Sequence, residues 1–108
     1  MTSLTLVGVS HHRAPIELRE RVALDLDACR ALAQQLAQLL GGEAVVLSTC
    51  NRTELYLARE EGAEEEAVAA VTELAGDRAA DLVAALYRLR DEAAALHLFR
   101  VAASSRSR

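Results

Sequence analysis

The residues best suited to chemistry lie together between Ser48 and Glu54, where a cysteine is flanked by hydroxyl, amide and guanidinium groups. Cys50 follows a short apolar run, residues 44–47, which predicts a buried strand. A strand end can hold a nucleophile still while leaving it open to substrate. Because the thiolate is the attacking species, a reactive cysteine needs a cationic neighbour, and Arg52 is the nearest candidate. A buried, inert thiol is the alternative.

The other cysteine has a different setting. Cys29 shares one helical face with Leu32, Leu36 and Leu39, so the pattern predicts that it packs in the core. We therefore expect Cys50, and not Cys29, to be the nucleophile.

The elements that must position Cys50 alternate along the chain. Strands are expected over residues 4–9, 43–48, 53–57 and 86–89, and helices over residues 16–22, 27–40, 64–75 and 92–103. Pro15 can open the first helix, Gly41 and Gly42 are expected to end the second, and Asp91 is expected to cap the last. Residues 81–85 fit either a helix end or a loop. This order predicts an α+β fold, a two-layer sandwich of an antiparallel sheet with helices on one face.

Length and charge narrow the class of protein. The chain has 108 residues and 52% hydrophobic residues, enough for one core of ordinary size. Its net charge of −4 argues against a general nucleic-acid-coating role. We expect a cytoplasmic protein with no membrane role, because two cysteines occur without a signal-like start and no apolar run approaches the roughly 20 residues that span a bilayer.

Three segments resemble the amino-terminal catalytic domain of glutamyl-tRNA reductases, the enzymes that open the five-carbon route to tetrapyrroles. Residues 43–56 (EAVVLSTCNRTELY) resemble the family's signature, residues 7–20 (VGVSHHRAPIELRE) its opening block, and residues 95–102 (ALHLFRVA) the helix with its active-site histidine. Three blocks in the same order make a specific resemblance. It implies a ferredoxin-like fold over residues 1–103.

The resemblance also implies a mechanism. Cys50 would attack the ester of glutamyl-tRNA to give a thioester, and hydride from NADPH would then release glutamate-1-semialdehyde. Arg52 would bind the substrate carboxylate, Thr49 would offer a hydroxyl to the glutamate moiety, and His97 would assist as an acid or base. The residues themselves leave other readings open: Arg52 could pair with Glu54 or Glu43, and Thr49 could be plain strand-end structure.

The carboxyl end departs from the family. Where the family continues through a Gly-Leu-Asp-Ser stretch into a nucleotide-binding domain, residues 104–108 read SSRSR, with Ser107 in register with the family's substrate-binding serine. No G-x-G-x-x-G motif occurs. We therefore expect a truncated or frameshifted reductase that binds no NADPH by itself and lacks the family's dimerisation region. A stand-alone domain that binds or hydrolyses aminoacyl esters, or a noncatalytic interaction module, is the alternative.

The remaining basic and imidazole groups carry weaker expectations. Any contact with tRNA would be local, through Arg13, Arg19 and Arg21, which could equally be solvated charges. Adjacent histidines, His11 and His12, point opposite ways in an extended chain, and no cysteine or carboxylate completes a ligand spacing. We expect no metal site.

Overall fold

The structure, a computed structural model, describes residues 2–10 and 14–106. Four strands form one sheet: β1 (Ser3–Ser10), β2 (Glu43–Ser48), β3 (Arg52–Arg59) and β4 (Tyr87–Arg90). The helices are α1 (Ile16–Arg21), α2 (Leu26–Leu40), α3 (Glu64–Ala75), α4 (Ala79–Ala85) and α5 (Asp91–Arg106), with a 3-10 turn η1 (Gly76–Arg78) before α4.

The sheet has the strand order β2-β3-β1-β4, and every neighbouring pair is antiparallel. The long strands β1 and β3 lie at its centre, paired from Ser3 opposite Arg59 to Ser10 opposite Arg52. This is the expected ferredoxin-like α+β arrangement, in which each crossover helix returns the chain to the same sheet.

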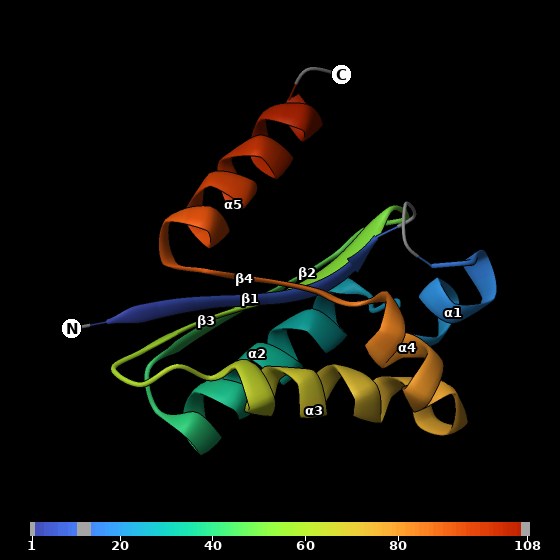
Figure 1. Ribbon diagram of the computed structural model, residues 1–108, viewed down its shortest axis with the longest axis horizontal. Coiled ribbons are helices and arrows are strands. Elements are labelled where there is room, and N and C mark those ends of the chain that lie inside the picture. The colour runs from blue at the N-terminus through green and yellow to red at the C-terminus, as the bar shows by residue number, and fades with distance from the viewer. Residues whose placement is uncertain (1, 11–13, 107–108) are drawn as a thin grey trace.

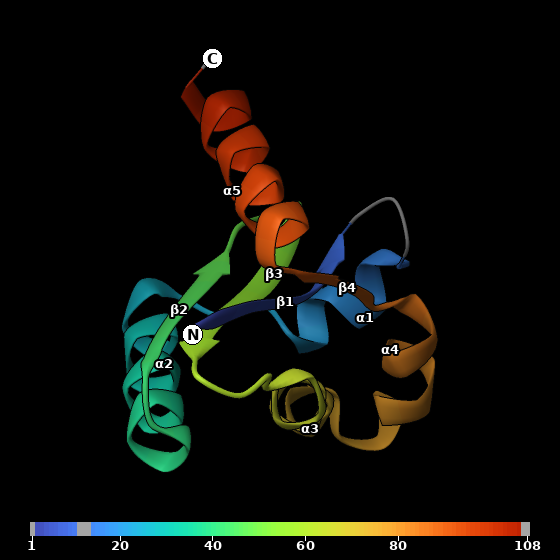
Figure 2. The same ribbon diagram turned by 60° about the vertical axis from the view of Figure 1, so that its left-hand side comes forward.

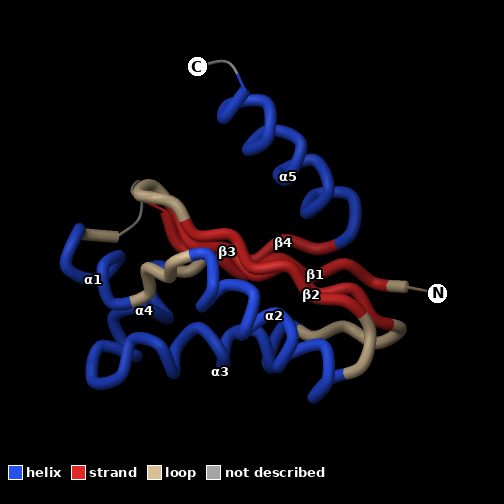
Figure 3. Tube along the Cα trace, turned by 180° about the vertical axis from the view of Figure 1, so that it is seen from behind, coloured by secondary structure: helices blue, strands red, loops and turns tan. Residues whose placement is uncertain are grey.

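Helices α1 to α4 cover one face of the sheet, as Figures 1 and 3 show. Alternation along β3 turns Leu55 and Leu57 to this face. Cys29 is 5% exposed and lies in the same core, so its predicted packing role is confirmed. The core side chains include Val7, Val9 and Leu55 from the strands and Leu18, Leu36, Val71 and Leu82 from the helices.

Helix α5 lies on the opposite side of the sheet and rises away from it (Figure 2), so the expectation that all helices share one face is wrong for this helix. Its first turns pack through Ala94 against Leu6 and Tyr56, which form a second, smaller apolar cluster. Farther along, Leu96 is 51% and Phe99 73% exposed, so the face that these two residues share is open in this chain. Helix α5 is thus anchored by its amino-terminal half, where His97 also lies.

Several sequence expectations need correction. Leu39, expected on the buried face of α2, is 77% exposed because it lies in the last turn of the helix, at the edge of the packed face. Asp91 does not cap α5: it adopts a left-handed backbone with φ of 51°, and its Oδ1 accepts the Leu4 amide at 3.0 Å. The ambiguous residues 81–85 are helical, within α4, and β4 begins one residue later than expected. Among the described residues, no helix has the length and apolar character to cross a bilayer.

Candidate active site

Cys50 lies in the tight turn between β2 and β3. The Thr49 amide donates to the Arg52 carbonyl at 2.8 Å and closes the turn, while the Asn51 amide donates to Thr49 Oγ1 at 3.2 Å. Cys50 is exposed and Cys29 is buried. The strand therefore delivers the thiol to an open position, as its place in the sequence predicts.

A small pocket of about 210 Å³ adjoins Cys50. It is lined by Cys50 and Arg52 from the turn and β3, and by Arg19 and Ile16 from α1. Arg19 donates through Nη1 to the Cys50 carbonyl at 3.1 Å and through Nε to the Ala14 carbonyl at 3.3 Å. Two arginines therefore contribute to the lining of the pocket that the thiol adjoins, where sequence reasoning expected only Arg52.

The base of this turn is fixed by a chain of hydroxyl groups. Thr53 Oγ1 donates to the Val22 carbonyl at 3.1 Å and lies 2.9 Å from Ser48 Oγ, which accepts the Leu24 amide at 3.0 Å. These bonds join the ends of β2 and β3 to the segment after α1. They hold Cys50 against α1, and the sequence offered no specific signal for them.

On the other face of β3 lies a buried cluster centred on Glu54. Its side chain is fully buried, yet its two oxygens have donors: Tyr56 Oη donates to Oε1 at 2.9 Å, Tyr87 Oη donates to Oε2, and His97 Nε2 lies 2.5 Å from Oε2. Arg52 Nη1 lies 3.6 Å from Oε2. A buried carboxylate is tolerable only with such partners.

Sequence reasoning treated Glu54 only as a possible ion-pair partner of Arg52 and missed the cluster. One signal was available. Glu54 and Tyr56 alternate with Thr53, Leu55 and Leu57, so the sequence placed a charge within a predicted strand. A polar residue there needs partners on neighbouring elements.

The environment raises the pKa values of the two phenols that contact Glu54. Burial first, then the charge of Glu54 and its hydrogen bond, raise the pKa of Tyr56 far above its ordinary value. Burial, the hydrogen bond to Glu54 and the charge of Glu54, in that order, do the same to the pKa of Tyr87. Both phenols are therefore held as neutral hydrogen-bond donors.

Gly8 provides the space for this cluster. On β1 it lies opposite Glu54 of β3 and Tyr87 of β4. A Cβ at Gly8 would lie 2.8 Å from Glu54 Cγ and 3.0 Å from the Tyr87 ring. The glycine is thus required by close approach of side chains.

His97 is brought to the cluster from α5. Its Nε2 lies 3.5 Å from Arg52 Nη1, and its ring packs against Tyr87 with centroids 5.4 Å apart. The two residues are thus adjacent, although 45 positions separate them in sequence. Arg52 is also among the residues that line the pocket beside Cys50, while its guanidinium lies at the buried cluster.

The other candidates divide into three groups. Thr49 is exposed, and its hydroxyl accepts the Asn51 amide. Arg21 is engaged by Asp77 at 2.6 Å and by the Ala75 carbonyl, which indicates a structural role, and this pairing lowers the pKa of the Asp77 carboxyl. The expectations for Ser107, Arg13, His11 and His12 lie outside the described residues. Within the described residues, no group of three potential ligands could hold a metal ion.

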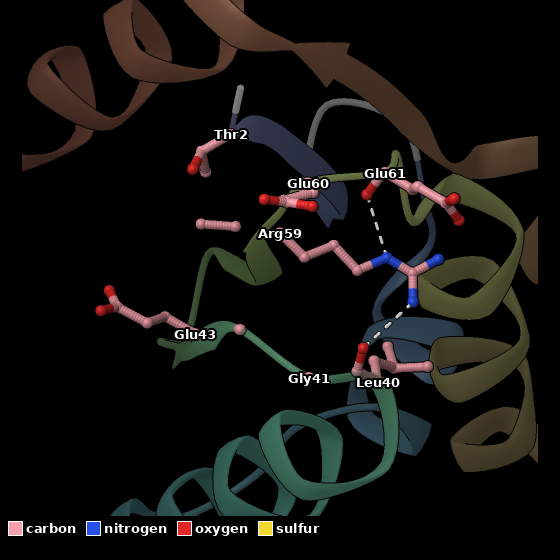
Figure 4. A pocket seen from close by; sticks show the side chains of 9 residues that line it. Thr2, Leu40, Gly41, Glu43, Arg59, Glu60 and Glu61 are labelled. Carbon is pink, nitrogen blue, oxygen red and sulfur yellow. Dashed lines mark hydrogen bonds between the residues drawn. The ribbon is translucent and has the colours of Figure 1, made fainter.

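A larger pocket of about 630 Å³ lies at the far end of the sheet, beside the β2–α2 and β3–α3 connections (Figure 4). Its rim carries Glu43, Glu60 and Glu61, and Arg59 is tied to the Leu40 and Glu61 carbonyls. Because Arg59 and Arg52 mark opposite ends of β3, this pocket is remote from Cys50. We attach no catalytic role to it.

Fold and site together define a ferredoxin-like α+β domain with one exposed thiol beside an arginine-lined pocket. The sequence matches the family described as "Glutamyl-tRNAGlu reductase, N-terminal domain" over residues 7–108. The chain belongs to this family.

Comparisons with individual relatives support this family assignment. The chain is 40% identical over 102 residues to glutamyl-tRNA reductase of Shewanella denitrificans and 43% identical over 105 residues to that of Marinobacter nauticus; each match covers 94% of this chain and 24% of the relative. The solved structure of glutamyl-tRNA reductase from Methanopyrus kandleri aligns with a TM-score of 0.58 and 28% identity, over 92% of this chain and 22% of that one. The chain thus spans about a quarter of the length of the curated relatives it matches.

Proposed function

We propose that this domain performs the acyl-transfer half of the glutamyl-tRNA reductase reaction, with Cys50 as nucleophile. The Cys50 thiolate attacks the carbonyl carbon of the ester that joins glutamate to the terminal ribose. The carbon–oxygen ester bond breaks, the ribose oxygen leaves with a proton, and glutamate remains on sulfur as a thioester. The observation that carries this proposal is the exposed thiol beside a pocket lined by Arg19 and Arg52.

The pocket offers recognition suited to this substrate. Arg52 binds the side-chain carboxylate of glutamate, since a guanidinium can hold a planar carboxylate through two parallel hydrogen bonds. Thr49 lies beside Cys50 and offers its hydroxyl to the same moiety, and Ser107 would join it. Arg19, already oriented by the Cys50 carbonyl, contributes positive charge where the tRNA end arrives. His97 exchanges the proton that the leaving oxygen requires.

The reductive half needs NADPH, which supplies hydride. The described residues do not fit this cofactor: the sheet is antiparallel throughout, whereas dinucleotides bind at the carboxyl ends of parallel strands beside a glycine-rich turn. We assign no reduction step to these residues. A fluorescence titration with NADPH is expected to show no saturable binding. We place the acyl transfer in the cytoplasm, where thiols stay reduced.

Intact-mass measurement after incubation with glutamyl-tRNA tests the proposal. A glutamyl adduct is expected on the wild-type chain and on Cys29→Ser, and none on Cys50→Ser. If wild type gives free glutamate with no adduct at any time point, the domain is a hydrolase or its thioester is short-lived, and rapid acid quenching separates these outcomes. The absence of both the adduct and free glutamate would contradict the proposal and favour an interaction module.

A further inference from the structure

We infer that Glu54 is the positioning residue of this site: it accepts the Nε2 proton of His97 and anchors Arg52, which leaves Nδ1 of His97 as the atom that exchanges a proton with substrate. The inference rests on the proposed acyl transfer for its catalytic part. Its structural part, the proton position on His97, stands on contacts in the described residues alone.

The proton position follows from counting donors. An ionised carboxylate only accepts hydrogen bonds, and an arginine only donates them. Among residues 2–10 and 14–106, the hydrogen-bonding atoms found near Nε2 are Glu54 Oε2 at 2.5 Å and Arg52 Nη1 at 3.5 Å. If Nε2 lacked its proton, its lone pair would face a buried carboxylate oxygen at 2.5 Å, which is repulsive. The proton therefore lies on Nε2, directed at Glu54.

The opposite ring nitrogen is then free for chemistry. The structure gives Nδ1 no hydrogen-bond partner among residues 2–10 and 14–106. The His97 side chain is 23% exposed, so solvent or substrate can approach the ring. A carboxylate that fixes the tautomer of a histidine and stabilises its charged form is a known catalytic arrangement.

Glu54 also keeps Arg52 and His97 close together. Both present N–H groups to each other at 3.5 Å, so their contact is unfavourable unless an anion lies beside it. Glu54 Oε2 provides that anion to both, 2.5 Å from His97 and 3.6 Å from Arg52. Tyr56 and Tyr87 hold the carboxylate from the remaining sides. Removing the charge while keeping the shape should thus disturb both partners together.

Nitrogen-15 NMR of the imidazole groups tests the structural part on the wild-type chain. In the neutral form of the His97 ring, Nε2 should show the protonated shift and Nδ1 the unprotonated shift. His97→Gln identifies its signals among those of the three histidines. Glu54→Gln should shift the signals toward a mixture of tautomers, while Tyr56→Phe, which keeps the Glu54 charge, should leave them unchanged. A proton on Nδ1 in wild type would overturn the inference even if Glu54→Gln failed to fold.

Acylation kinetics test the catalytic part. At saturating glutamyl-tRNA, Glu54→Gln should slow thioester formation on the order of 10²-fold, the lower end of what general acid–base catalysis contributes. The rate of thioester formation by Tyr56→Phe should fall by less than about tenfold. Near-ultraviolet circular dichroism of both variants checks that they are folded. An unchanged rate in folded Glu54→Gln contradicts the positioning role. Absence of any adduct on wild type instead contradicts the proposed function, and the tautomer measurement still decides the inference.

Discussion

Replacing Gly8 with alanine should destabilise the domain by crowding the Glu54 cluster. Gly8 lies between Glu54 and Tyr87 across the sheet, and a methyl group would meet Glu54 Cγ at 2.8 Å and two Tyr87 ring carbons at 3.0 Å. The contact with Glu54 is closer than side chains tolerate, the contacts with Tyr87 are tight, and both partners are tied to other groups. The methyl group therefore has to displace the cluster.

The size of the effect comes from two opposing contributions. Overpacking a well-filled site costs about 1–3 kcal/mol. Gly8 is not among the glycines with positive φ, so alanine brings no backbone strain there and regains about 0.4–1 kcal/mol by restricting the unfolded chain. The net loss is about 1–2 kcal/mol, which for a domain near this size lowers the melting temperature by roughly 5–15 °C.

Thermal and urea denaturation followed by circular dichroism measure this loss. Gly62→Ala is the matched control, because its methyl group would meet chiefly the mobile end of the Arg90 side chain. Its stability should stay within about 0.5 kcal/mol of wild type. In a Glu54→Ala background, which removes Cγ, Gly8→Ala should cost at least about 0.5 kcal/mol less. Equal stabilities of the two glycine variants, or strict additivity in the double variant, would refute the reasoning.

Three further predictions concern the thiols, the phenols and Arg52. Iodoacetamide should modify Cys50 before Cys29 in the folded chain, as peptide mapping would show; faster labelling of Cys29 contradicts the assignment. Tyr56 and Tyr87 are the chain's two tyrosines, and both have raised pKa values. The folded chain should therefore show little tyrosinate absorbance at about pH 11, whereas unfolded phenols, with a pKa of about 10, are mostly ionised there. The stability that these neutral phenols contribute is complete below about pH 10 and is lost as the pH rises toward the folded values; phenols that ionise near pH 10 in the folded chain would contradict the burial. Arg52→Lys should weaken discrimination of glutamyl- over glutaminyl-tRNA by about 1.5–3 kcal/mol, measured by competitive acylation, and unchanged selectivity would exclude the carboxylate-binding role.

The strands and the position of Cys50 could be predicted because they depend on local pattern. Alternation along residues 53–57 and the apolar run before Ser48 indicate strands directly, and β2 has the predicted bounds. The glycine after α2 marks the end of that helix, since Gly41 has a φ of 75°. Such signals are read within a few residues of where they act.

The Glu54 cluster could not be predicted in the same way, because its members meet only through tertiary structure. Gly8, Tyr87 and His97 come from β1, β4 and α5, and their proximity depends on the strand order and on the sharp turn at Asp91. The resemblance to the family pointed to His97 without indicating its partner. A charge in a central strand was the local sign that partners must exist elsewhere.

The sequence alone left two roles for Arg52, an ion pair with Glu54 or a grip on substrate, and the geometry makes them compatible. Nη1 of Arg52 lies 3.6 Å from Glu54 Oε2, which is longer than an ordinary hydrogen bond. A guanidinium has five N–H donors in a rigid plane, so one edge can be anchored while another faces a ligand. The side chain is 22% exposed, so solvent or a ligand can reach its unanchored edge, and Arg52 is among the residues that line the Cys50 pocket. We infer that the ion pair orients Arg52 for substrate, and that the buried carboxylate is therefore a condition of carboxylate recognition beside the thiol.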